Sequence, residues 1–250
     1  MHLTHGTLDT SITLFTSVGG AIALGAAFWG ARRQLSTPQV PALLVMSSFV
    51  FIAQMVNCST GFGFSGHLVG ASLLAVFFGP YAAMLSMATI LALQAGLLGD
   101  GSFSTLGANF LVMGVVAPWV AYGLFQLLRG GNTLRADAKQ VGAMAGASFA
   151  SIVAASLCLS GMIGSISTAE MLPIAAVWGA LEAIIAVAVF ALCVSSESDR
   201  FAAASRLAFK PLAFICFLTL CLVPFSSQEP DGLEHVLEVA QLSGEPNALN

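Results

Sequence analysis

Eight long apolar runs occupy most of the chain and constrain its fold more than any other feature. They lie at about 11–31, 41–57, 67–79, 80–98, 107–128, 140–163, 171–194 and 208–225. A membrane-spanning helix needs about 20 consecutive apolar residues. Only 8% of the 250 residues are charged, whereas soluble domains carry about 25%. The sequence therefore predicts an all-α polytopic membrane protein that is surrounded by membrane lipid.

The third run is short, and it ends in the letters FFGP, where Gly79 and Pro80 should break a helix. Before it lies the Gly-rich polar stretch NCSTGFGFSG, residues 57–66. Irregular backbone at membrane depth is tolerated only where it is buried in protein or lines a cavity. The 57–66 stretch is therefore a candidate binding loop.

The positive charges predict the orientation of the chain. All eight Lys and Arg residues fall in three clusters, at 32–33, 129–139 and 200–210. With eight spans these clusters share one side, which the positive-inside rule assigns to the cytoplasm. We expect a cytoplasmic (inner) membrane protein with both termini outside and, because no signal peptide pattern is present, a retained amino terminus. The outer side then carries the four histidines, His2, His5, His67 and His235.

Two of these histidines suggest a metal site. A histidine at position 2 lets the Met1 amine, the deprotonated His2 amide nitrogen and the His2 Nδ1 form fused chelate rings on one ion. The imidazole of His67 could complete a plane of four nitrogens, which suits Ni(II) or Cu(II). The alternative is a solvated terminal histidine and a loop histidine that caps a helix, and spacing alone does not decide between them.

Four separated motifs strengthen the metal hypothesis. The chain starts with MHLTHGTL and then has SGHLVG at 65–70, GDG at 99–101 and LGAN at 106–109. In sequence and order they resemble the CbiM/NikM family, the nickel/cobalt substrate-binding (S) component of energy-coupling-factor (ECF) ABC transporters. The resemblance covers about residues 1–195. The family's acid at position 5 is His5 here, and a later family motif survives only as Gly179 and Glu182.

The resemblance implies the site residues. The metal ligands would be the Met1 amine, the amide and imidazole of His2, and His67, with the amino-terminal segment inserted in the bundle. Asp100 is expected to be a loop cap rather than a ligand. Glu182 is either a functional acid or a hydrogen-bonded packing residue. The residues expected to support the ligands are His5, Asn57, Ser65 and Asn109. The two asparagines would do so by hydrogen bonds to the histidines.

The resemblance also implies the domain organisation. We expect seven family transmembrane helices plus one appended C-terminal helix, with the N-terminus outside. Residues 1–195 would form the metal-binding component, 196–210 a cytoplasmic linker, and 211–250 the appended helix and an outward tail. That tail contains PDGLE at 230–234, which resembles a motif of small accessory parts of these transporters. The alternative is a disordered, solvated tail.

The implied function is capture of Ni(II) or Co(II) as the transported ligand, with no cofactor. The implied partners are a transmembrane coupling protein, two ATPase subunits and a small accessory membrane subunit, and no nucleic acid. The sequence has no G-x-x-x-x-G-K-[ST] phosphate loop, so partners would hydrolyse ATP, and it has no enzyme motif. Two alternatives stay open: a cobalt-specific uptake component for cobalamin synthesis, and a self-sufficient secondary metal carrier or channel.

Overall fold

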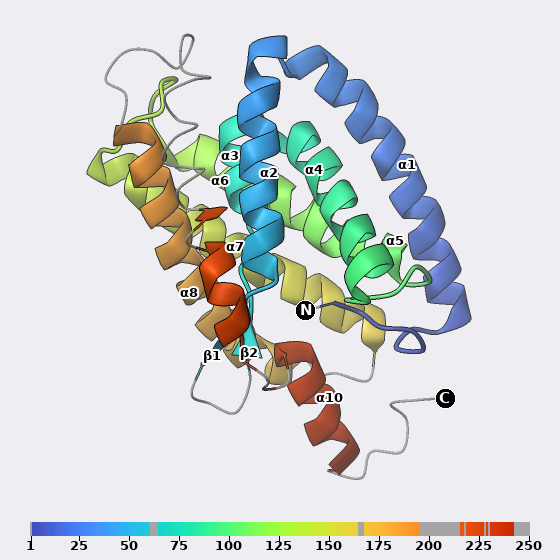
Figure 1. Ribbon diagram of the computed structural model, residues 1–250. Helices are drawn as coiled ribbons and strands as arrows, with labels where there is room; N and C mark the ends of the chain where they lie inside the picture. Colours follow the sequence, from blue (N-terminus) through green and yellow to red (C-terminus); the bar gives the residue numbers. More distant parts are fainter. Residues whose placement is uncertain are drawn as a thin grey trace.

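The computed structural model describes residues 2–60, 65–164, 168–195, 216–217, 219–227, 229 and 231–242. These residues form a helical bundle with one two-residue β-hairpin (Figure 1). In chain order the elements are α1 (Thr10–Gln34), the 3-10 turn η1 (Thr37–Gln39), α2 (Val40–Gln54), β1 (Cys58–Ser59), β2 (Ser65–Gly66), α3 (Ala71–Phe78), α4 (Pro80–Leu93), the π-helix η2 (Gln94–Leu98), α5 (Leu106–Asn109), the π-helix η3 (Phe110–Val116), α6 (Ala117–Leu128), α7 (Ala138–Ile163), α8 (Thr168–Ser195), the 3-10 turn η4 (Val223–Phe225) and α10 (Gly232–Leu242).

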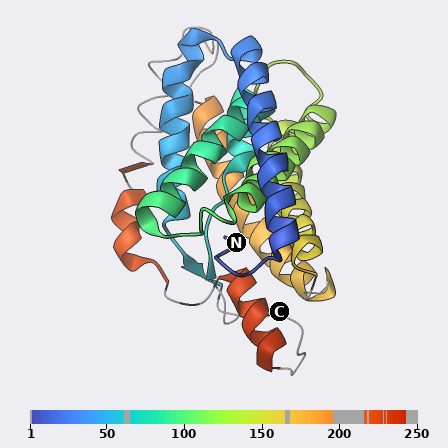
Figure 2. The ribbon, with the colours of Figure 1, turned by 90° about the vertical axis from the view of Figure 1, so that its right-hand side faces the viewer.

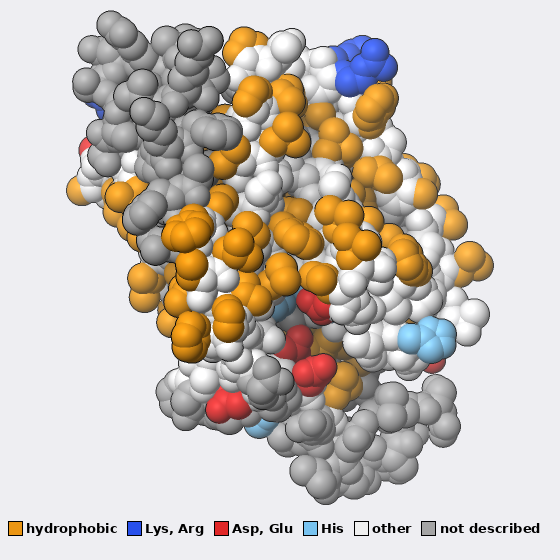
Figure 3. Space-filling model, in the orientation of Figure 1, with side chains coloured by type: hydrophobic (Ala, Val, Ile, Leu, Met, Phe, Trp, Pro, Cys, Tyr) orange, Lys and Arg blue, Asp and Glu red, His pale blue; other side chains and the backbone are white. Residues whose placement is uncertain are grey.

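Six of the described helical segments are long and apolar enough to cross a membrane. They are Thr10–Gln34, Thr37–Gln54, Pro80–Leu98, Leu106–Leu128, Ala138–Ile163 and Thr168–Val194. Apolar side chains also cover much of the outer surface of the body (Figure 3), as lipid-facing helices require. The prediction of a helical, multi-pass membrane protein is confirmed.

The run at 67–79 does not contain a membrane-long helix, which corrects the prediction for that span. Its helix α3 has only 8 residues, because the residues before it are extended and Gly79 ends it at φ +84°. Pro80 then starts α4, so the predicted helix break is confirmed. The predicted linker at 196–210 lies outside the described residues, as does most of the run at 208–225.

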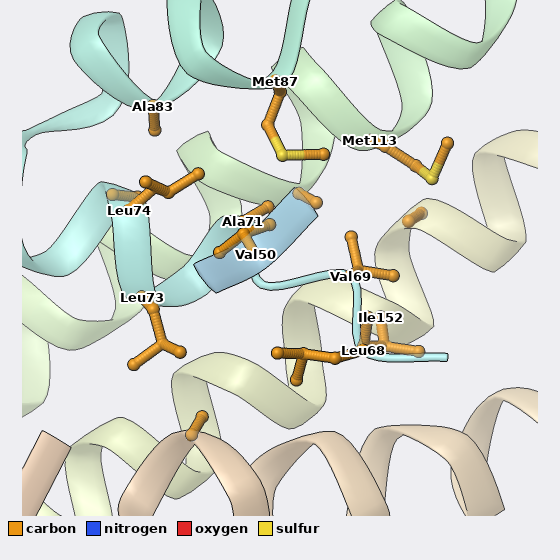
Figure 4. Packing of buried hydrophobic residues seen from close by; sticks show 14 of the residues in the cluster. Val50, Leu68, Val69, Ala71, Leu73, Leu74, Ala83, Met87, Met113 and Ile152 are labelled. Carbon is orange, nitrogen blue, oxygen red and sulfur yellow. The ribbon is translucent and has the colours of Figure 1, made fainter. Parts of the chain in front are cut away.

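Helix α3 lies at the centre of the bundle. Its residues 71–77 are all buried, and it packs against α2, α4, α6, α7 and α8. Figure 4 shows Leu73 and Leu74 in the buried cluster, together with Leu68 and Val69 of the extended segment before the helix. The core therefore surrounds the point at which extended chain becomes helix.

Helix α1 packs through small residues and exposes large ones. Phe15 and Ile22 are 78% and 70% exposed, whereas Gly20 and Gly30 are buried. A Cβ added to Gly20 would lie 3.2 Å from the Cα of Gly107 on α5. Small residues let membrane helices approach closely, and here they bring the α1 backbone against α5.

The two ends of the bundle differ in charge. The α1–α2 junction and the α6–α7 connection lie at one end, and the N-terminus and the β-hairpin lie at the other (Figures 1 and 2). Arg32 and Arg33 end α1, and Arg129, Arg135 and Lys139 lie in or beside the α6–α7 connection. Two of the three predicted positive clusters therefore share one end. The third lies outside the described residues.

The contact between α1 and α5 makes a testable prediction about stability. A Cβ at Gly107 would lie 2.6 Å from the Cα of Ser17 and 2.7 Å from the carbonyl oxygen of Thr16. Gly107→Ala should therefore destabilise the protein by about 1–3 kcal/mol, as overpacking does. Gly25→Ala is the matched control, because nothing lies within 4 Å of its added Cβ. It should stabilise helix α1 by about 0.5–1 kcal/mol. Thermal unfolding in detergent measures both, and an equal response of the two variants would contradict the packing.

The charge distribution predicts the orientation in the membrane. Single cysteines would replace Thr133 and Asp9, which are both exposed, in a variant that lacks the five native thiols. In intact cells, a membrane-impermeant maleimide should label position 9 and label position 133 only after the membrane is permeabilised. Labelling of position 133 from outside would reverse the assigned orientation.

Candidate metal centre

The amino-terminal segment enters the bundle and is held there by α5. His2 and Leu3 are 6% and 0% exposed. Asn109 accepts the Leu3 N–H at Oδ1 over 2.8 Å and donates from Nδ2 to the Leu3 carbonyl over 3.1 Å. The Thr105 hydroxyl donates to the same carbonyl over 2.6 Å. The main chain of Leu3 is thus fully hydrogen-bonded inside the protein, which fixes the position of the adjacent His2.

His67 lies on the extended segment between β2 and α3, and its side chain is buried. Its Nδ1 lies 3.1 Å from the carbonyl oxygen of Leu68. A carbonyl only accepts hydrogen bonds, so Nδ1 carries the hydrogen and Nε2 has a free lone pair. The indole N–H of Trp178 donates to the His67 carbonyl over 2.6 Å. Backbone and ring orientation of His67 are therefore both fixed.

Glu182 of α8 holds the residues that follow His67. One carboxylate oxygen accepts the Val69 N–H over 2.7 Å, and the other accepts the Gly70 N–H over 2.8 Å. Gly70 is the N-cap of α3, with φ +71°, and a carboxylate is stabilised at the N-terminus of a helix. Gln54 donates to the Val69 carbonyl over 2.7 Å. The open question about Glu182 is answered in favour of a hydrogen-bonded structural residue.

The two imidazole rings lie against each other. The ring centroids of His2 and His67 are 5.1 Å apart, and the rings are stacked with 24° between their planes. The Nε2 atoms of both are buried and have no hydrogen-bond partner. A buried nitrogen without a partner is costly. Each Nε2 can therefore donate an electron pair to a ligand that accepts one, as a metal cation does.

The electrostatics of the site favour the neutral, metal-binding form of His67. Burial and, to a smaller extent, neighbouring positive charges lower its pKa from the ordinary 6.5 to about 3. The Nδ1 of His2 lies 3.1 Å from Oδ1 of Asp100. Burial raises the pKa of Asp100, but the hydrogen bond and the charge of His2 lower it below its ordinary value overall. Metal binding needs an unprotonated imidazole, and His67 provides one at neutral pH.

The geometry of His2 differs from the predicted chelate. The sequence assigns Nδ1 of His2 to the metal, but in the structure Asp100 contacts Nδ1 and Nε2 is unpartnered. Sequence reasoning missed this contact, because it treated Asp100 as a loop cap. Gly99 and Gly101, at φ +69° and +84°, form the turn that carries the carboxylate. The residue types in GDG indicate this turn but not its histidine partner.

The residues expected around the ligands take other partners. Asn109 binds the main chain of Leu3 rather than an imidazole. Asn57 is held through its main chain by Ser226 and Ser227, and its Oδ1 has no partner. The Ser65 hydroxyl donates to the Glu229 carbonyl over 2.7 Å. His5 is exposed, with Nδ1 3.0 Å from the Ser104 hydroxyl.

Side chains alone do not complete a metal site. Among the described residues, no group of three or more His, Cys, Asp or Glu side chains could hold a metal ion. None of the five cysteines, all in described positions, forms a disulfide bond. A site built on His2 and His67 therefore needs further donors, and main-chain nitrogens at the amino-terminal segment are the nearest candidates in the sequence.

Comparison with known proteins places this arrangement in a family. The family model "CbiM: Cobalt uptake substrate-specific transmembrane region" matches residues 2–200. A cobalt transport protein CbiM of Desulforamulus reducens is 35% identical over 138 residues, which are 53% of this chain and 54% of that protein. A putative metal transport protein of Haloquadratum walsbyi is 34% identical over 52% of this chain and 59% of that protein. The matches thus span little more than half the length of these relatives.

Solved structures show the same fold. The crystal structure of a transition metal transporter aligns with a TM-score of 0.65 and 29% identity, covering 76% of this chain and 90% of that one. A truncated transition metal transporter aligns with a TM-score of 0.58 and 26% identity, covering 91% of this chain and 100% of that one. Because the family model also matches far more than half of the chain, the protein belongs to the CbiM family of cobalt uptake substrate-specific transmembrane regions.

Proposed function

We propose that the protein is the substrate-capture membrane component of an importer for Ni(II) or Co(II). The observation that carries the proposal is the pair of buried, stacked imidazoles whose Nε2 atoms have no protein partner. Their place at the end of the bundle opposite the arginines supports capture from the outer face of the inner membrane. The relatives named for cobalt and nickel transport support the class of substrate.

Four nitrogen donors would hold the ion. We assign them to the Met1 amine, the His2 amide, the His2 Nδ1 and His67, and for this chelate the His2 Nδ1 has to exchange its contact with Asp100 for the ion. The absence of a three-residue side-chain cluster in the described part of the chain favours main-chain donors. A nitrogen plane favours Ni(II) on electronic grounds, whereas the family description favours cobalt. Both ions therefore belong in the binding test, and a cobalt-specific component is the second candidate.

Partners would supply the energy for transport. The chain has no phosphate-binding loop, so we propose that a transmembrane coupling protein and two ATPase subunits drive uptake, as in ECF importers. Two relatives, from Archaeoglobus fulgidus and Lactiplantibacillus plantarum, are named fused nickel transport proteins. These names support a further, small membrane component in the assembly. The proposed chain is a transport component and not an enzyme.

Loss of a ligand tests the metal site directly. His67→Ala, His2→Ala and a form with an acetylated amino terminus should each lose more affinity than the about 10- to 100-fold typical of a lost supporting residue. His5→Ala is the control, because His5 is exposed and contacts Ser104, and its affinity should stay within about threefold. Titration of the purified forms with Ni(II) and with Co(II) measures the effect. Wild-type affinity of the acetylated form would exclude the amine.

The clamp on Leu3 makes a separate prediction. Asn109→Ala removes both side-chain hydrogen bonds to Leu3, so the segment that carries His2 loses its anchor. Metal affinity should fall about 10- to 100-fold while His67 is unchanged. Asn57→Ala is the matched control, since the Asn57 side-chain oxygen has no partner. Equal affinities of the two variants would show that the clamp does not position the site.

A further inference from the structure

A segment near the carboxy terminus, described at residues 226–227, 229 and 231–237, docks on the hairpin beside the proposed metal site. The Asn57 N–H donates to the Ser226 hydroxyl over 2.8 Å, and the Ser227 N–H donates to the Asn57 carbonyl over 2.7 Å. Ser65, two residues before His67, donates to the Glu229 carbonyl and forms a parallel β-bridge with Asp231. This segment is therefore bonded to both ends of the hairpin region, through one isolated bridge to β2 and hydrogen bonds to Asn57 and Ser65.

Helix α10, which follows the bridge to Ser65, buries an apolar face. Asp231 begins the helix, because its carboxylate accepts the N–H groups of Leu233 and Glu234 over 2.7 and 2.9 Å. Leu233 and Val236 are 1% and 5% exposed, and Leu237 packs against the same core. The spacing i, i+3, i+4 is that of one helix face. Helix α10 thus docks by hydrophobic burial, and the residues before it dock by hydrogen bonds.

The docked segment closes a pocket against a metal-site residue. The pocket is lined by Gly66 and His67 on one side, by Trp178 of α8, and by Gly232 and Leu233 of α10. His67 and His2 are both more than nine-tenths buried, although the N-terminus and the hairpin lie at one end of the bundle (Figure 2). Leu233 is also buried and lines the same pocket as His67.

Acidic side chains gather at the end of the bundle that carries the N-terminus and the hairpin. Figure 3 shows acidic side chains gathered at a hollow in this end of the molecule, near a histidine. Glu229, Asp231 and Glu234 all belong to the docked segment, whereas the Lys and Arg residues of the described chain lie at the opposite end or in the α6–α7 connection. Such an arrangement concentrates cations near the entrance.

We propose that the docked segment, residues 226–227, 229 and 231–237, forms a movable cover over the metal site, and that a divalent cation enters and leaves when it opens. The inference rests on the proposed function and adds a kinetic role for the carboxy-terminal segment. The cover must undock for an ion to pass, so the docking contacts set the rates of binding and release. Affinity changes less, because entry and release are affected together.

Loosening the cover is the first test. In Leu233→Ser/Val236→Ser, the buried face of α10 loses most of its apolar contact, and the open form should be populated about tenfold more or higher. Release of Ni(II) and Co(II) to an excess of chelator, followed by stopped flow, should accelerate by that factor, with a change in Kd of less than about threefold. The control is Leu44→Ser/Leu127→Ser, which makes the same exchange at two exposed leucines outside the segment and should release metal at the wild-type rate.

Locking the cover is the second test, and it does not depend on the stability of the serine variant. Asn57→Cys/Ser226→Cys, in a chain without the native thiols, joins two residues that are already hydrogen-bonded. The oxidised form should bind metal at least about tenfold more slowly than the same sample after reduction. Equal rates in the oxidised and reduced forms overturn the cover. Absence of metal binding in the wild type would overturn the proposed function instead.

Discussion

The non-helical backbone of residues 65–70 is buried among helices, so its peptide groups need hydrogen-bond partners within the protein. The arrangement of the candidate metal site follows from that requirement. In an apolar environment each unsatisfied peptide group costs several kcal/mol. That is a large share of the free energy of unfolding of a whole domain, which is about 5–15 kcal/mol. Glu182, Gln54 and Trp178 supply the partners, from α8 and α2. Because these three side chains hold the backbone, His67 has one position and one ring orientation. The centre of the bundle is thus built around a non-helical segment that carries His67, the proposed metal ligand.

The second requirement is close approach of helices without hydrophobic driving force. Lipid tails are as apolar as Leu, so membrane helices associate through packing. A Cβ at Gly107 would lie 2.6 Å from the Cα of Ser17 on α1, and one at Gly30 would overlap the ring of Tyr81 on α4. The close approach at Gly107 holds α5 beside α1, and it thereby places Thr105 and Asn109 beside the amino-terminal segment. This contact between helices thus positions the side chains that hold Leu3, next to His2.

Features that depend on local sequence could be predicted, and features that depend on long-range pairing could not. The break at Gly79–Pro80 follows from the backbone of two residues, and the lipid-spanning helices follow from apolar length. His2 and His67 could be paired because a residue-2 histidine has a known chelate chemistry and the family motifs match.

The partners of Glu182, Asp100 and Asn109 lie far along the chain, and nothing in their own neighbourhoods identifies them. The contact of Ser65 with the carboxy-terminal segment had no sequence signal, since a tail rich in acids reads equally well as solvated. The length of helix α3 was overestimated, because apolar composition does not reveal that residues 67–70 before it are not helical.

The clamp on Leu3 has a mechanical consequence. The segment 2–9 is joined covalently to α1 and by hydrogen bonds to α5, while α1 and α5 touch each other through Gly20 and Gly107. Segment, α1 and α5 therefore form a closed ring, and α1 cannot slide along α5 without pulling on the residues next to His2. Helix α1 also exposes large side chains such as Phe15 and Ile22. A change in bilayer thickness that tilted α1 would therefore act through this ring on the segment that carries His2.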